Sequence, residues 1–109
     1  MKFVLFALLL ISGVAAAQPA PAAPYTTYGV GNGSCGEWLH DRKSNGWFQT
    51  GEWVLGYVSA YGYYGDYQLK HVDSEAMAAW IDNYCQKNPL DSIETATQHL
   101  IEALKINKR

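Results

Sequence analysis

The side chains best suited to recognise another molecule are the tyrosines that crowd the stretch from Trp53 to Tyr67. Trp53, Tyr57, Tyr61 and Tyr64 follow one another at intervals of four, four and three residues. This is the period of a helix, so one helical face is expected to carry all four rings. Packing in the core, with the hydroxyls at its rim, is the usual role of such a stripe.

Two further tyrosines lie outside that stripe, in a glycine-rich segment. Tyr63 and Tyr67 are interspersed with Gly62, Gly65 and Asp66. Recognition surfaces use such segments because tyrosine adds contact area at a low cost in conformational entropy. We therefore predict an exposed binding surface, and the residues assigned to it are Tyr61, Tyr63, Tyr64, Asp66 and Tyr67.

The polar side chains form no recognisable catalytic pattern. Glu37 with Asp41, and Glu52 with Asp66, could act as paired carboxylates, but such pairs also arise by chance in an acidic chain. His40 beside Asp41 is more often a solvated residue than a metal ligand. No serine or cysteine has a base at a recognised local spacing. The sequence therefore predicts no enzymatic activity, no cofactor and no metal site.

Cys35 and Cys85 are the only cysteines of the chain. An even number of cysteines in an exported protein favours a disulfide. There is no Cys-x-x-Cys motif, and no histidine lies at the usual ligand spacing from either cysteine, which disfavours a redox or metal role. We predict one disulfide between them.

The first residues have the features of a secretory signal peptide. Lys2 precedes the apolar run 3–11, and Ala15-Ala16-Ala17 satisfies the small-x-small cleavage rule. The apolar run is shorter than the roughly 20 residues that a membrane span needs. Residues 1–17 are therefore predicted to be removed by cleavage between Ala17 and Gln18, leaving an exported protein with no membrane span.

The remaining chain divides into a spacer and one small domain. Residues 18–28 begin with the Pro/Ala-rich stretch "QPAPAAP", which is typical of an extended linker, and residues 29–109 form the folding unit. The chain has 8 basic and 10 acidic side chains, and the basic ones form no patch or stripe. Nucleic acid is therefore not expected as a partner.

Four helices are predicted in this domain. The first begins at the capping box Ser34–Glu37 and ends at Asn45-Gly46. The second runs from Trp47 to about Tyr64, and Gly51 and Gly56 inside it each cost about 1 kcal/mol relative to alanine, which the close passage of another helix would justify.

The other two helices follow after a loop. The third is capped by Asp73 or Ser74 and is stopped by Asn88-Pro89. The fourth opens with Asp91 as its cap, and Lys105, Lys108 and Arg109 complement the dipole at its end. No useful β-alternation occurs, so the sequence predicts a small all-α bundle of about four helices, with the disulfide joining the first to the third.

Three stretches carry a family resemblance. "SCGEWL", "WVLGYVSAY" and "WIDNYCQKNPLDSIETATQHLIEAL" resemble the Rap/Tai-type immunity proteins and, more loosely, the HdeA-like periplasmic proteins. The resemblance implies an HdeA-like helical fold. It also implies a periplasmic protein that binds and inhibits a peptidoglycan amidase delivered by a type VI secretion system.

The expected function is therefore binding of another protein, either a cell-wall hydrolase or a chaperone client, by a monomer or a dimer. An immunity-like partner of a cell-wall hydrolase is the first hypothesis. An acid-stress periplasmic chaperone is the alternative that the HdeA-like resemblance implies. A small cell-envelope enzyme with an unrecognised site is the third.

Overall fold

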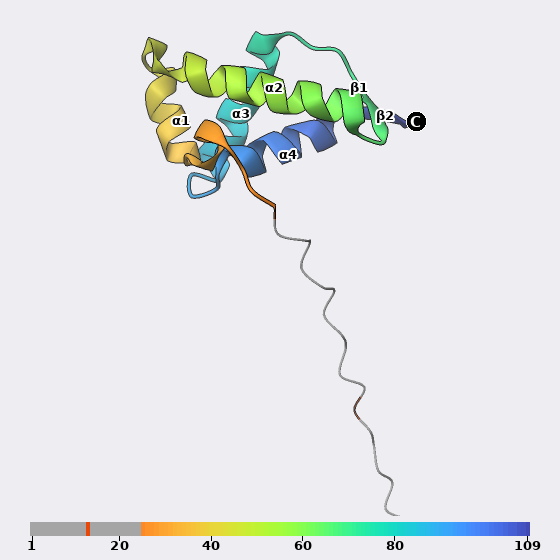
Figure 1. The fold of residues 1–109 in the computed structure, drawn as a ribbon. Coiled ribbons are helices and arrows are strands. Elements are labelled where there is room, and N and C mark those ends of the chain that lie inside the picture. Colours follow the sequence, from red (N-terminus) through yellow and green to blue (C-terminus); the bar gives the residue numbers. More distant parts are fainter. Residues whose placement is uncertain (1–12, 14–24) are drawn as a thin grey trace, which may run out of the picture.

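The computed structural model describes Gly13 and residues 25–109 (Figure 1). Apart from Gly13, the predicted signal peptide 1–17 lies outside the described residues, as do its cleavage point and spacer residues 18–24. The described chain forms four α-helices, two 3₁₀ turns and two short strands. In chain order these are η1 (Gly29–Asn32), α1 (Cys35–Arg42), η2 (Asn45–Trp47), α2 (Phe48–Tyr64), β1 (Tyr67–Leu69), α3 (Ser74–Lys87), α4 (Ile93–Leu104) and β2 (Lys105–Lys108).

The helices enclose one hydrophobic core. Helix α2 runs along the domain with α4 beside it (Figure 1). Helix α1 packs against α3. Trp38 of α1, Ile81 of α3 and Leu100 of α4 are each at most 2% exposed. The predicted class, a small helical bundle, is confirmed. Among the described residues, no helix has both the length and the apolar character needed to cross a membrane.

Side-chain caps define the starts of three helices. Ser34 Oγ accepts from the Glu37 amide at 3.1 Å, and Glu37 Oε2 accepts from the Ser34 amide at 3.0 Å, so the predicted capping box is present. Asp73 caps α3 as predicted. The prediction that Asp91 caps α4 is wrong, because Ser92 Oγ accepts from the Thr95 amide instead.

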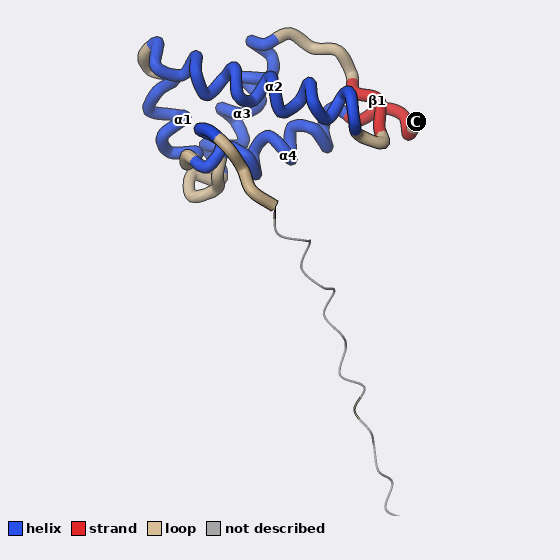
Figure 2. The backbone as a smooth tube through the Cα atoms, viewed as in Figure 1, coloured by secondary structure: helices blue, strands red, loops and turns tan. Residues whose placement is uncertain are grey.

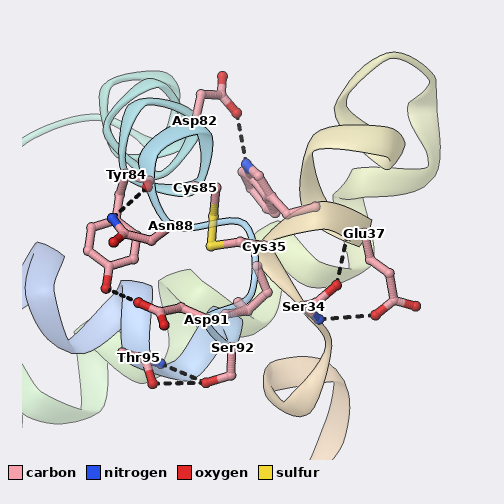
Figure 3. Close-up of a disulfide and its surroundings, with 12 residues drawn as sticks. Ser34, Cys35, Glu37, Asp82, Tyr84, Cys85, Asn88, Asp91, Ser92 and Thr95 are labelled. Carbon is pink, nitrogen blue, oxygen red and sulfur yellow. Dashed lines mark hydrogen bonds between the residues drawn. A yellow bond between two sulfur atoms is a disulfide. The ribbon is translucent and has the colours of Figure 1, made fainter.

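Asp91 has a different role: it lies in the loop before α4 and joins that loop to α3. Its carboxylate accepts a hydrogen bond from the Tyr84 hydroxyl at 2.5 Å (Figure 3). The Tyr84 ring lies between two other rings, with Trp80 at 5.7 Å and His99 at 5.1 Å between centroids. Burial and the hydrogen bond to Asp91 together raise the pKa of Tyr84 to about 12.

Two predicted helix ends differ from the structure. Helix α1 ends at Arg42, earlier than Asn45-Gly46, and Asn45 begins the turn η2. Helix α4 ends at Leu104, so Lys105 and Lys108 belong to β2 rather than to a helix.

The strands β1 and β2 are the element that the sequence did not predict. They pair antiparallel, with Tyr67 opposite Lys108 and Leu69 opposite Lys105, at the end of α2 (Figure 2). Strands of three and four residues are too short to show alternation in the sequence. Their pairing instead depends on α4 bringing β2 back to β1.

The predicted disulfide between Cys35 and Cys85 is confirmed. It links α1 to α3, and both residues are completely buried (Figure 3). A second connection lies beside it, where Asp82 accepts from Trp38 Nε1 at 2.8 Å and from Arg42 Nε at 2.9 Å. The short helix α1 is therefore held to α3 by one covalent bond and by a shared carboxylate.

We expect the double substitution Cys35→Ala/Cys85→Ala to lower the free energy of unfolding by about 4 kcal/mol, because the bond closes a loop spanning 50 residues. Urea unfolding of the oxidised parent, the reduced parent and the variant measures this. The reduced parent should unfold at nearly the same urea concentration as the variant. Equal midpoints for the oxidised parent and the variant would contradict a stabilising role.

The raised pKa of Tyr84 predicts that the free energy of unfolding falls at alkaline pH. Because its pKa in the folded protein lies above its ordinary value, the neutral hydroxyl stabilises the fold fully below about pH 10. That contribution is lost as the pH rises from about 10 to about 12. Over this interval the free energy of unfolding should fall more steeply in the parent than in Tyr84→Phe. Tyr63→Phe, at an exposed ring, should follow the parent, and identical slopes for all three would refute the assignment.

Candidate functional site

Helix α2 carries apolar side chains on two faces, and only one of them is buried. Gly51, Val54 and Val58 face the core. The predicted stripe is not a buried face, because Trp53, Tyr57 and Tyr61 are half-buried and Tyr64 is 84% exposed. The expectation that this stripe packs in the core is therefore wrong at Tyr64. The smaller valines fill the core, and the stripe lies along the edge of the bundle.

The residues predicted to bind a partner are brought together at the end of α2. We call Tyr61, Tyr63, Tyr64, Asp66 and Tyr67 the tyrosine end. Tyr63 and Tyr64 are 76% and 84% exposed, and their rings meet edge to face at 4.7 Å. Tyr67 lies on β1 rather than in a loop and is half-buried.

Lys105 links the two half-buried tyrosines of this end. Its Nζ lies 5.5 Å from the centroid of the Tyr61 ring and 4.7 Å from that of Tyr67, within the range of cation–π attraction. The hydrogen bond to Glu102 at 2.5 Å raises the pKa of Lys105, so the side chain is a cation at neutral pH. The two rings therefore have a fixed position relative to α4 and β2.

Arg109 holds the turn between α2 and β1. Its guanidinium donates to the carbonyl oxygens of Gly62, Tyr63 and Gly65, and its backbone amide donates to Asp66 O at 2.7 Å. A Cβ at Gly65 would lie 2.6 Å from Tyr61 O, so the chain can make this turn only with glycine. The backbone that carries the exposed tyrosines is therefore held by the Arg109 guanidinium and by the Arg109 amide.

The sequence did not reveal the roles of Lys105 and Arg109. Both are more than 35 residues from the tyrosines that they contact, and the sequence predicts for them only a position at a helix end. A local signal does not exist for such contacts. The strand pairing, which creates them, was itself missed.

A shallow hollow of about 330 Å³ adjoins the tyrosine end, lined by Tyr57, Ala60, Tyr61, Tyr64 and Gly65. Basic side chains are also near, since β2 supplies Lys105 and Lys108, followed by Arg109. An exposed aromatic pair, a shallow apolar hollow and a basic border are together suited to contact with a protein surface.

The other candidate polar residues lie on several elements of the fold. The Glu37 carboxylate is engaged in the capping box, and Glu52 lies on the second turn of α2 while Asp66 lies beyond the end of that helix. His40 and His71 are exposed. Within the part of the chain that the structure describes, no group of three or more His, Cys, Asp or Glu side chains could hold a metal ion.

Comparison of the chain with protein-family models, with curated proteins and with solved structures finds no match. The resemblance to immunity proteins and to HdeA-like proteins therefore stays a prediction.

Arg109→Ala is expected to loosen the tyrosine end while leaving the core intact, because it removes the side-chain bonds to the α2 carbonyls and keeps the backbone bond to Asp66. Amide hydrogen exchange should become faster at residues 63–67 and stay unchanged in α3. Lys108→Ala, at the neighbouring exposed position, is the matched control. Unchanged exchange at residues 63–67 in the Arg109 variant would show that the guanidinium does not hold this turn.

Proposed function

We propose that the protein is an exported, non-catalytic binding protein whose tyrosine end docks on a cell-wall hydrolase of the peptidoglycan amidase class. The observation that carries this proposal is the exposure of Tyr63 and Tyr64 on a turn fixed by Arg109 and by the strand pair. Large aromatic rings exposed on a fixed backbone mark binding surfaces, whereas scattered single apolar residues do not.

A protein partner suits this surface for an energetic reason. Tyrosine and arginine are enriched among the residues that contribute most to protein–protein affinity. Because Arg109 and Lys105 already hold the turn and two of the rings, little backbone freedom remains to be lost on binding. The exposed rings can therefore contribute most of their contact energy to the affinity.

The charged residues near the tyrosine end indicate which charges the partner's surface should carry. Lys108 and Arg109 lie on or beside β2 next to the tyrosines, whereas Lys105 is paired with Glu102 and Asp66 adds a negative charge at this end. A partner with carboxylates around an apolar recess would complement both the rings and this basic border.

The class of partner is supported by the three resembling stretches and by the disulfide, which suits an oxidising compartment where the cell wall lies. A small binding protein can inhibit a hydrolase simply by covering its substrate cleft. The tyrosine end would then act as the covering surface.

One observation favours a second candidate, an acid-activated chaperone. Three carboxylates connect separate elements of the fold: Asp82 joins α3 to α1, Asp91 joins α3 to α4, and Glu94 accepts from Thr27. Loss of these three connections would release apolar surface. Loss of near-ultraviolet circular dichroism at about pH 3, together with suppression of client aggregation there, would favour this function over the first.

The direct test measures inhibition of, and affinity for, a purified peptidoglycan amidase of the class delivered by type VI secretion systems. We expect the mature protein to inhibit that enzyme, and Tyr63→Ala and Tyr64→Ala each to weaken binding by about tenfold or more. Both variants should keep the parent's unfolding midpoint, since these rings contribute little buried area.

Leu90→Ala is the matched control, because Leu90 is 96% exposed and lies in the loop between α3 and α4, away from the tyrosine end. It should bind as the parent does. Full affinity in both tyrosine variants, or no effect of the protein on the amidase, would exclude the proposed function.

A further inference from the structure

A second recess lies between the segment 25–28, α2 and α4, and it has a volume of about 410 Å³. Its lining is mainly aromatic and includes Tyr25, Tyr28, Trp53, Gly56, Tyr57 and Glu94. This volume lies within the range of pockets that hold small molecules. Glu94 is the one carboxylate in this lining.

Glu94 is 9% exposed, and its two oxygens differ in their environment. Oε2 accepts a hydrogen bond from the hydroxyl of Thr27. Oε1 is buried and receives no hydrogen bond from any residue that the structure describes. The position of Glu94 in the first turn of α4 suits the helix dipole, but a dipole does not supply the missing donor. A buried acceptor without a donor is costly, and because Oε1 is closed to solvent, a donor in the recess reaches it only when the Glu94 side chain turns toward the recess.

The aromatic walls are fixed by hydrogen bonds of their own. Trp53 Nε1 donates to Tyr28 O at 2.7 Å, and the Trp53 and Tyr57 rings lie 5.2 Å apart. Gln98 Nε2 donates to the hydroxyls of Tyr25 at 2.9 Å and Tyr57 at 3.3 Å. The aromatic walls of the recess are therefore held in place by contacts within the protein.

Gly56 gives this recess its floor on the α2 side. A glycine inside a helix destabilises it relative to alanine, and the close passage of another helix would have justified that cost. The structure does not show such a passage, because a Cβ at position 56 would meet no atom within 4 Å. The absence of a side chain here instead leaves the recess open.

The charge of Glu94 also affects the rim. The hydrogen bond from Gln98 lowers the pKa of the Tyr25 hydroxyl, but the neighbouring Glu94 and burial outweigh it, and the net shift is upward.

We propose that this recess binds a primary ammonium group carried on an alkyl stem. The N–H groups of the ammonium would donate to Glu94 Oε1, and the Trp53 and Tyr57 rings would contact its charge and its stem. A quaternary ammonium has no N–H for Oε1, and an alcohol has no charge for the rings, so both should bind more weakly. This inference does not depend on the proposed function, because the tyrosine end lies outside the lining of the recess.

The ammonium has two natural sources, a free small amine or the side chain of a lysine-like residue in a peptide. Both present the same chemistry to Glu94. The ligands compared in the test therefore include pentylammonium as the free amine and Nα-acetyl-lysine methylamide as the peptide form.

The test is calorimetric titration of the full mature chain with pentylammonium, 1-pentanol, tetramethylammonium and Nα-acetyl-lysine methylamide. We expect saturable binding of pentylammonium, with 1-pentanol and tetramethylammonium at least about tenfold weaker. If the lysine derivative also binds, the recess is assigned to lysine-like side chains of peptides. If the lysine derivative does not bind, the recess is assigned to free amines.

Variants at two positions isolate the site. Glu94→Gln should weaken pentylammonium binding by about tenfold or more, whereas Glu102→Gln, the same change on the exposed side of α4, should not. Gly56→Leu should fill the recess and abolish binding, and Gly56→Ala should retain it.

Unfolding midpoints close to that of the parent verify that each variant is folded. Gly56→Leu keeps the test decisive if Glu94→Gln fails to fold. Equal binding of pentylammonium and 1-pentanol, full affinity in Gly56→Leu, or no saturable binding by the parent would overturn the proposal.

Discussion

The Cys35–Cys85 bond is the constraint on which the rest of this small domain depends. It joins α1, a helix of eight residues, to α3, and both sulfurs lie in the centre of the core. A domain of this size buries a modest share of its surface, so a crosslink that restricts the unfolded chain contributes a large part of the net stability. With α1 fixed, α2 and α4 can pack side by side. Helix α4 then brings the chain back to the C-terminal end of α2. The β1–β2 pair and the position of Arg109 both follow from that return.

The same architecture separates structural from recognition side chains on α2. The core accepts the small residues Gly51, Val54 and Val58, with Gly51 packed against the Trp47 ring, and the larger rings are left along the edge. At one end of this edge the rings surround Glu94, and at the other Tyr63 and Tyr64 extend into solvent. One helix therefore carries two surfaces of different chemistry, an aromatic recess beside Glu94 and an exposed pair of tyrosine rings.

Local chemistry made much of this fold predictable, and non-local contacts account for what was missed. The capping box at Ser34, the cap at Asp73 and the disulfide each leave a short or compositional signal. The two faces of α2 were confused because both are apolar at helical spacing, and only packing decides between them. The strand pair, the contacts of Arg109 and the Glu94 recess join segments more than 35 residues apart, so none of them has a pattern within a sequence window.

We propose that the tyrosine end is the surface that meets the partner hydrolase. Amide hydrogen exchange of the protein, free and in complex with that enzyme, tests this claim most directly. Slower exchange on binding should be concentrated at residues 61–67 and in the paired strand 105–108, with α1 and α3 unchanged. Protection confined to α1 and α3, with the tyrosine end exchanging as in the free protein, would contradict the assignment of the tyrosine end as the binding surface.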